Sequence, residues 1–324
     1  MKPKKLVTVL TLMAVSLGSS AWAQADKFSD RPVKLIVPFA AGGGVDNAAR
    51  VLAHQLQNQL GTPVVVENRS GASGTVGGKV VQTAPADGNT LLFSAATHVL
   101  AKQVLRHPPY DPQADFAPVA RVGEAPLMLV AAPNLEYKNL KELMAAARQQ
   151  PDRFTAGIPA AGAPSHLATL LLAKQAGVSF TFVAYRGTQP ALTDVAGGHT
   201  ALLLDSMISV LPLAKGGRVK PMAITAAKRS ALAPEVPTAK ESGYPEVIYS
   251  SWYGVWAPKG TPPERIKRLN TAINAAVVEQ AKAGAWANLG IEPVTESVEQ
   301  FTRFIASDVA QGAELLKSAG FQPE

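Results

Sequence analysis

The sequence predicts an α/β protein with two lobes, each built on a parallel sheet that helices cover. Three observations support this fold class. The chain has 324 residues, enough for two domains. Short apolar strand candidates alternate with helix candidates whose apolar residues recur with helical spacing. This alternation stops at the proline-rich segment 108–112 and resumes further along the chain, so we expect a second α/β lobe.

The composition is that of a soluble globular protein, with 47% hydrophobic and 17% charged residues. Removing Lys2, Lys4 and Lys5, which lie in a leader segment, from the formal net charge of +7 leaves +4. No dense basic run follows them, so we expect no nucleic-acid partner. The chain has no cysteine, which excludes disulfides, cysteine nucleophiles and thiolate metal sites.

The first 23 residues have the pattern of a secretory signal peptide. A basic start precedes the apolar run 6–17, and Ala21-Trp22-Ala23 supplies an A-x-A cleavage motif. No other stretch has the roughly 20 apolar residues of a membrane span. No cysteine follows the apolar run, so a lipid anchor is not expected. We therefore expect cleavage after Ala23, a mature chain from Gln24, and a soluble periplasmic protein.

The opening unit of the mature chain is a strand, a glycine turn and a helix. The branched apolar run 33–37 leads into Gly42, Gly43 and Gly44, and apolar residues follow at positions 48, 52, 56 and 60. Asp46 stands where a helix N-cap is expected. The glycines remove side chains from the turn, and the first N–H groups of the helix have no partner within it. The turn is therefore a candidate anion site.

The middle of the chain continues the alternation. The first lobe is expected to add a buried strand at 63–69, a glycine-rich loop at 70–78, a helix at 79–84 and a strand at 90–94. We predict that strands 119–122 and 127–130, joined by a turn around Pro126, carry the chain to the second lobe. The second lobe is expected to contain strands at 154–158, 180–185, 201–204 and 222–225, and helices at 140–149, 166–176, 191–196 and from 207 to about 215.

The aromatic stretch 249–256 is predicted to be a strand that returns to the first lobe. Helices are expected after it at 262–279, 282–289 and 298–319. The predicted division is a signal peptide at 1–23, a first lobe at 24–124 and 248–324, and a second lobe at 125–247. Ligands of parallel sheets bind beyond the carboxyl ends of the strands, so we expect a ligand cleft between the lobes.

Two glycine-rich segments fail the requirements of nucleotide-binding loops. Residues 42–47 lack the last glycine of the G-x-G-x-x-G fingerprint, so a structural turn without a ligand is the alternative there. In 73–80, Ser73 and Val80 stand where a phosphate loop needs glycine and Ser or Thr. The five histidines show no metal-binding spacing, and the carboxylates form no local pair. We expect no cofactor and no metal.

Three residues at loop ends have two interpretations each. Ser165 caps a helix or holds a carboxylate oxygen of the ligand. Asp205 makes a ligand or hinge hydrogen bond, or it caps the following helix. His166 is a packed, hydrogen-bonded residue or the base of a secreted α/β hydrolase, but the chain has no G-x-S-x-G nucleophile motif. We favour the packed role for His166 and expect no enzyme.

Motifs along the whole mature chain resemble the Bug family of extracytoplasmic solute receptors. The resemblance begins with Arg31-Pro32-Val33-Lys34-Leu35-Ile36-Val37-Pro38-Phe39 and the glycine turn with Asp46. It continues in order through the matching segments 61–69, 86–92, 110–112, 165–168, 185–187, 190–194 and 257–263. The family is similar to the receptors of tripartite tricarboxylate transporters. The resemblance implies a two-lobed, type II-like periplasmic binding protein that closes like a flytrap on a small carboxylated solute.

The resemblance also implies a site and partners. The glycine turn and the loop before Ser165 would grip a carboxylate, and other loops would line the cleft. The implied ligand-binding residues are Phe39, Ala40, Gly42, Gly43, Gly44, Asp46, Ser94, Ala95, Thr97, Ala161, Gly162, Ser165, His166, Tyr185, Gly187, Thr188 and Asp205. The expected partners are the carboxylate and the membrane permease subunits of a tripartite transporter, with the receptor itself a monomer. The alternative is a stand-alone or sensory receptor that hands its closed form to a signalling membrane protein.

The chain departs from the family pattern in two loops. Segment 158–164 has fewer hydroxyls and glycines than is usual in the family, and segment 94–98 lacks the common glycine. Neither gripping loop contains arginine, so an ion pair to the ligand would have to come from Arg186. Otherwise helix N-termini and ordered water would hold the carboxylate. The rest of the solute is left open.

Overall fold

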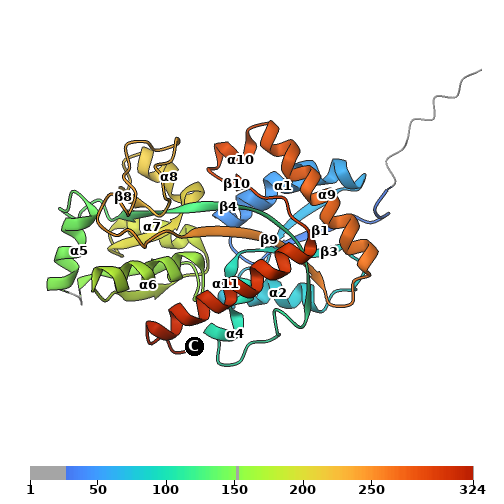
Figure 1. Ribbon diagram of the computed structural model, residues 1–324, viewed down its shortest axis with the longest axis horizontal. Coiled ribbons are helices and arrows are strands. Elements are labelled where there is room, and N and C mark those ends of the chain that lie inside the picture. Colours follow the sequence, from blue (N-terminus) through green and yellow to red (C-terminus); the bar gives the residue numbers. More distant parts are fainter. Residues whose placement is uncertain (1–26, 151–152, 324) are drawn as a thin grey trace, which may run out of the picture.

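The computed structural model describes residues 27–150 and 153–323. The predicted signal peptide, 1–23, and the cleavage site after Ala23 lie outside these residues. Within the described part, no helix has the length and apolar character that crossing a membrane requires. Figure 1 shows two α/β parts side by side, joined by long strands that run through both.

The described elements alternate as predicted. The first part contains β1 (Val33–Val37), α1 (Gly44–Leu60), β2 (Val64–Asn68), a 3-10 turn (Ala72–Gly74), α2 (Thr75–Gln82), β3 (Thr90–Ser94), α3 (Ala96–Val99) and α4 (Ala101–Val104). After β4 (Phe116–Ala131), the second part contains α5 (Leu140–Gln149), β5 (Thr155–Ile158), α6 (Pro164–Ala176), β6 (Thr181–Ala184), α7 (Thr188–Gly197), β7 (Leu202–Ser206), α8 (Met207–Lys215) and β8 (Lys220–Ile224). The chain returns through β9 (Ser250–Pro258) to α9 (Pro263–Lys282), α10 (Ala285–Asn288), β10 (Glu292–Pro293) and α11 (Val298–Ser318).

The strands form one mixed sheet in the order β2-β1-β3-β9-β4-β7-β5-β6. β1 pairs in parallel with β2 and β3, and β5 pairs in parallel with β6 and β7. β9 and β4 lie between these two parallel groups and are antiparallel to their neighbours. β8 and β10 pair with β4 as well. The two parallel groups confirm the predicted two-lobed α/β class, and β9 confirms the predicted return strand.

β4 shows that the prediction of two short strands joined by a turn at Pro126 was wrong. It is one strand of 16 residues, and its first part, from Phe116 to Pro126, pairs with β9. The next residue, Leu127, pairs with Ser206 of β7. A proline is tolerated at this transfer point because its missing N–H removes a single hydrogen bond of the ladder. The crossing between the lobes is therefore a continuous strand.

Two other predictions about the first lobe are corrected. β2 is an edge strand and not a buried one, since it pairs only with β1 in the described sheet and Val65 is 45% exposed. The glycine-rich segment 73–80 is mostly helix α2 and not a loop. A Cβ added at Gly78 would lie 2.1 Å from Tyr110 Oη, and one at Gly77 would lie 2.8 Å from Pro38 Cβ. Close packing of α2 therefore accounts for these glycines without a nucleotide.

Apolar side chains of both lobes are buried against the sheet, and α11 connects the lobes. α11 lies across the front of the view in Figure 1 and packs against β4 and α6. A Cβ added at Gly312 of α11 would lie 2.9 Å from Leu100 and 3.5 Å from Leu167, so this glycine permits a close approach. The C-terminal helix therefore touches elements on both sides of the crossing strands. The exact lobe limits, 24–124 with 248–324 and 125–247, remain a prediction.

Candidate functional site

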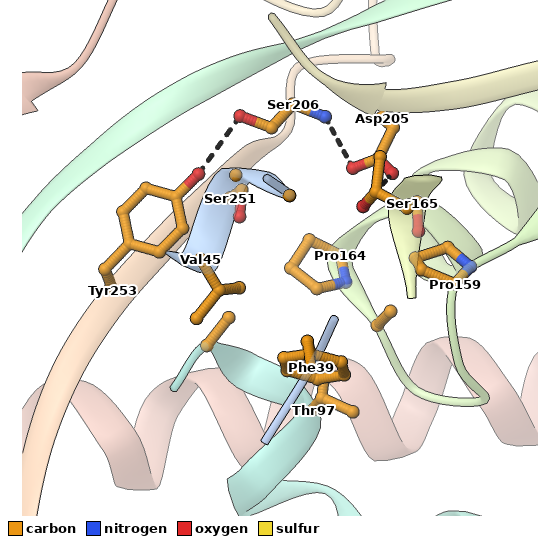
Figure 2. A pocket seen from close by; sticks show the side chains of 15 residues that line it. Phe39, Val45, Thr97, Pro159, Pro164, Ser165, Asp205, Ser206, Ser251 and Tyr253 are labelled. Atoms are coloured by element: carbon orange, nitrogen blue, oxygen red, sulfur yellow. Dashed lines mark hydrogen bonds between the residues drawn. The ribbon is translucent and has the colours of Figure 1, made fainter. Parts of the chain in front are cut away.

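A pocket lies between the two lobes, where β1, β3, β5, β6 and β7 end (Figure 2). Its cavity volume, the space open to the centre of a water-sized sphere, is about 30 Å³. Its 15 lining residues are Phe39, Gly43, Gly44, Val45, Ala95, Thr97, Pro159, Ala163, Pro164, Ser165, Thr188, Asp205, Ser206, Ser251 and Tyr253. The position agrees with the rule that parallel sheets bind ligands beyond the carboxyl ends of their strands.

Four helices begin at this pocket. α1 starts at Gly44, α6 at Pro164 and α7 at Thr188, and all three residues line the wall. α8 starts directly after Ser206, which also lines it. The predicted helix 191–196 began three residues too late, because Pro190 is tolerated in the first turn of α7. The positive dipole ends of four helices, whose first N–H groups have no partner within the helix, thus converge on one cavity, an arrangement that favours an anion.

Asp46 stabilises the glycine turn from behind. The predicted N-cap role is wrong, since Gly43 holds that position. Asp46 Oδ2 accepts hydrogen bonds from Gly42 N–H at 2.8 Å and Arg50 Nε at 3.0 Å, and Oδ1 accepts one from Asn68 Nδ2 at 2.9 Å. Burial by itself would raise the pKa of Asp46, but these hydrogen bonds and the Arg50 charge outweigh it and lower the pKa below its usual value. Asp46 therefore fixes the shape of the turn and does not line the pocket.

The lobes touch each other around the pocket. A Cβ added at Gly44 would lie 3.2 Å from both Ser206 Cβ and Tyr253 Oη, so only glycine fits here without displacement. Ser206 Oγ and Tyr253 Oη share a hydrogen bond of 3.0 Å, drawn in Figure 2. Gln189 Nε2 of α7 donates to the Gly42 carbonyl at 2.7 Å and so joins the second lobe to the glycine turn. The structure is thus a closed form.

Ser165 offers an unused hydroxyl. The predicted N-cap role is wrong, because Ala163 holds that position and α6 begins at Pro164. Ser165 Oγ is buried in the pocket wall and has no hydrogen-bond partner within the described part of the chain. A buried hydroxyl without a partner is costly, so a ligand oxygen here would relieve that cost.

His166 is packed against the loop that precedes α6. Its Nδ1 accepts a hydrogen bond from Gly162 N–H at 3.1 Å, and its ring contacts Phe182 and Phe321 edge-on, with centroid distances of 4.9 and 5.3 Å. Burial lowers the pKa of His166 to about 4, so the ring is neutral at neutral pH. His166 does not line the pocket. The packed role that the sequence favoured is confirmed.

Asp205 is the only acidic or basic side chain among the described lining residues. Its Oδ2 accepts a hydrogen bond from Thr188 Oγ1 at 2.7 Å, and its Oδ1 accepts one from Ser206 N–H at 2.6 Å, at the start of α8. Burial raises the pKa of Asp205 to about 6, although these two hydrogen bonds act in the opposite direction. Asp205 is therefore both a partner of the α8 N-terminus and part of the pocket wall.

The structure brings eight of the seventeen predicted ligand residues together in the wall. These are Phe39, Gly43, Gly44, Ala95, Thr97, Ser165, Thr188 and Asp205. The other nine lie in or directly beside the same loops but outside the wall: Ala40, Gly42, Asp46, Ser94, Ala161, Gly162, His166, Tyr185 and Gly187. Tyr185, for example, donates its hydroxyl to Asp194 Oδ2 at 2.7 Å. Arg186 is exposed and does not line the pocket, so it supplies no cation to the wall.

Seven lining residues were not named among the seventeen predicted ligand residues, although Val45, Ala163 and Pro164 lie within the two loops that were predicted to grip the carboxylate. The seven are Val45, Pro159, Ala163, Pro164, Ser206, Ser251 and Tyr253. Most neighbour a predicted residue, but Ser251 and Tyr253 come from β9, which was predicted only as a return strand. Alternate residues of a strand face the same side of a sheet, so the period of two in 249–256 was the available signal.

Comparison with known proteins assigns the family. Residues 48–321 match the family described as tripartite tricarboxylate transporter family receptor. The chain is also 38% identical over 322 residues to protein BugT of Bordetella pertussis, with 99% of both chains covered. The chain belongs to this receptor family. The resemblance to Bug receptors that the sequence motifs indicated is confirmed.

Solved structures of related receptors have the same fold. The periplasmic binding protein BugD matches with a TM-score of 0.84 and 34% identity, covering 91% of this chain and 100% of that one. An R. palustris protein with adipate matches with a TM-score of 0.87 and 34% identity, covering 91% and 99%. MatC from Rhodopseudomonas palustris, with bound malate, matches with a TM-score of 0.82 and 30% identity, covering 89% of this chain and 99% of that one. This receptor is thus a two-lobed solute-binding protein of a periplasmic family and not an enzyme, and the hydrolase alternative for His166 is wrong.

Proposed function

We propose that the receptor captures a small carboxylated solute between its lobes and delivers it to the permease subunits of a tripartite tricarboxylate transporter. The observation that carries the proposal is the convergence of four helix N-termini on a pocket whose described wall contains no basic side chain. Backbone N–H groups and helix dipoles bind anions without a counter-ion. The unpaired Ser165 hydroxyl adds a further polar group for a carboxylate oxygen.

The proposed grip has two sides. The glycine turn at Gly43 and Gly44 would hold the carboxylate from the first lobe, and the N-terminus of α6 at Ser165 would hold it from the second. Phe39 and Thr97 would pack against the remainder of the solute. Relatives that hold adipate or malate support a small organic acid as the class.

Substitution of Gly44 by Val tests this site. The panel consists of mono-, di- and tricarboxylates, including adipate and malate, and binding is measured by calorimetry and by the thermal shift of the mature protein. We expect at least one acid to bind, and we expect Gly44→Val to weaken it about 100-fold or more, because a branched side chain would enter the space between Ser206 and Tyr253.

Ala281→Val is the matched control, since Ala281 is an exposed residue near the end of α9 and does not line the pocket. It should bind like the wild type. If no acid in the panel binds the wild type, or if Gly44→Val binds as tightly as the control, the proposed site is wrong.

Delivery is tested separately from binding. We propose that the chain is exported, cleaved after Ala23 and released to the periplasm as a monomer, which mass spectrometry and light scattering of the exported form would check.

Deleting the gene in the source organism should abolish uptake of the labelled panel acid that binds. Unchanged uptake together with a lost transcriptional response to the acid would favour the sensory alternative.

A further inference from the structure

The pocket combines an anion-binding arrangement with a buried acid. Four helix N-termini favour a negative charge, yet Asp205 already places a carboxyl group in the wall and is 7% exposed. Two anions inside one narrow pocket repel each other strongly, because water screens little of their interaction in such a site. A bound carboxylate must therefore meet either a protonated Asp205 or a cation that compensates it.

No described side chain supplies that cation. On α1, Asp46 is already paired with Arg50 behind the glycine turn. On α7, Asp194 accepts a hydrogen bond from Tyr185, and on α8 the basic residue is Lys215, at the far end of the helix. The remaining elements around the acid contribute neutral groups. These are Met128 of β4, which pairs with Asp205, Tyr253 of β9, and His166 of α6, which accepts a hydrogen bond from Gly162.

The hydrogen bonds of Asp205 permit a proton. An ionised carboxylate offers about four acceptor positions, and only two are used, by Thr188 Oγ1 and Ser206 N–H. A protonated carboxyl keeps enough acceptor capacity for both donors and gains an O–H that can point toward a ligand oxygen. Repulsion is then replaced by a hydrogen bond.

We propose that the receptor takes up one proton on Asp205 when it binds a carboxylate, so that the solute and the proton are held together in the pocket. This inference rests on the proposed function, because it concerns the same site. It adds a second bound species, the proton, to the carboxylate.

The size of the expected change in affinity with pH follows from the pKa of Asp205. With a pKa of about 6, Asp205 is protonated in about 3% of ligand-free molecules at about pH 7.5. A carboxylate that binds only the protonated form therefore has an affinity about 30-fold weaker at that pH than at about pH 5. We expect the affinity to rise by about tenfold per pH unit as the pH falls from about 8.5 to 6.5, and to level off below about 6.

Calorimetry counts the proton directly. The mature receptor is titrated at about pH 7.5 with adipate, with malate and with any other panel acid that binds, in phosphate and in Tris, whose ionisation enthalpies differ. The dependence of the measured enthalpy on the buffer gives the number of protons taken up. We expect close to one proton per bound acid at pH 7.5, where adipate and malate are fully ionised in solution, and a smaller uptake by Asp205 as the pH falls through about 6.

Two variants identify the group. Asp205→Asn should bind without proton uptake and without the pH slope, whereas Asp30→Asn, which removes the same charge at a side chain that is 98% exposed, should behave like the wild type. If Asp205→Asn does not fold, Thr188→Val serves instead. It removes a hydrogen bond that stabilises the ionised form, so the pH at which the affinity levels off should move upward.

Three results would overturn the proposal. The first is a panel acid that binds the wild type with no proton uptake at pH 7.5. The second is uptake that persists in Asp205→Asn. The third is binding confined to acids that carry an ammonium group, again without uptake, since Asp205 would then pair with the ligand's cation. If no acid binds at all, the proposed function itself fails, and this outcome is distinct from the other three.

Discussion

The two sides of the pocket each contain a buried aspartate near a helix N-terminus, yet the two acids are in opposite electrostatic states. Asp46, behind the glycine turn, is 2% exposed, and Asp205, at the end of β7, is 7% exposed. The pKa of Asp46 lies below its usual value because Arg50, Gly42 and Asn68 donate to it. The pKa of Asp205 is raised to about 6 because burial outweighs its two neutral donors. Asp46 has the cation Arg50 as a partner, whereas Asp205 has only neutral donors and loses more of its solvation, so partners and depth of burial together account for the difference.

This difference in pKa distinguishes Asp46, which stabilises the fold, from Asp205, which belongs to the pocket wall. Both oxygens of Asp46 are used by the turn, by Asn68 of β2 and by the Arg50 cation, so its charge is satisfied before any ligand arrives. Asp205 keeps unused acceptor capacity in the pocket wall and has no cation beside it. We infer that the glycine turn is preorganised, whereas the end of β7 changes its protonation state when the pocket fills.

The largest effect on stability is expected at the satisfied acid. Asp46→Asn replaces one acceptor oxygen by an NH2 group that faces donors, which leaves donors of Gly42 or Asn68 without a partner. We expect a loss of about 3 kcal/mol in the free energy of unfolding, measured with urea. Asp30→Asn, on an exposed side chain, should change it by less than about 0.5 kcal/mol. Unchanged stability with lost ligand binding would reverse the assignment of the two acids.

The second largest effect is a gain in stability and is expected for Asp205→Asn. Because the pKa of Asp205 is about 6 in the folded protein and 3.8 when the carboxyl group is free in water, its stabilising contribution is complete below about pH 4. That contribution is lost as the pH rises through about 6. We therefore compare the free energies of unfolding of ligand-free Asp205→Asn and the wild type. The variant's value minus that of the wild type should be about 2 kcal/mol larger at pH 8 than at pH 4. A difference that does not depend on pH would show that Asp205 is not poised in this way.

The sequence predicted the first of these regions better than the second. The strand, glycine turn and helix of 33–60 are local patterns, and the structure contains them at the expected place. The role of Asp46 was misassigned because its partner Asn68 lies 22 residues away on another strand. An N-cap is the usual local interpretation of an aspartate before a helix, and only tertiary packing overrides it.

The second region depends on contacts that no local pattern contains. Asp205 was predicted at a strand end, but its burial requires α7 to begin at Thr188 and the first lobe to close over it. The crossing strand β4 was missed for a similar reason, since Pro126 reads as a turn until its position between β9 and β7 is known. The period of two in β9 places Ser251 and Tyr253 on one face of the sheet, but only the tertiary structure shows that this face meets the pocket.

A third, smaller effect on stability tests whether a side-chain acceptor, His166, stabilises the loop before α6 as Asp46 stabilises the glycine turn. His166→Asn can place Oδ1 where Nδ1 accepts from Gly162 N–H, whereas His166→Gln moves the amide one bond further away. Both lose the ring contacts to Phe182 and Phe321, so their difference isolates the hydrogen bond. We expect the Gln variant to be less stable than the Asn variant by about 1 kcal/mol in urea unfolding. Equal stabilities would mean that this loop needs no such support.

The smallest effect is expected where the two sides meet. Gln189→Ala removes the hydrogen bond from the second lobe to the Gly42 carbonyl but leaves both acids and the pocket wall unchanged. A single hydrogen bond that forms on closure is worth about 1 kcal/mol, so the affinity for a bound panel acid should fall by about two- to tenfold. The loss should appear in the dissociation rate, measured by stopped flow. The hydrogen bond stabilises the closed complex and plays no part in the first encounter of ligand and receptor. Gln113→Ala, at an exposed residue of another loop, should leave the rate unchanged. An unaltered rate in Gln189→Ala would mean that this hydrogen bond does not hold the closed form, and that other contacts between the lobes, such as the one between Ser206 and Tyr253, are sufficient.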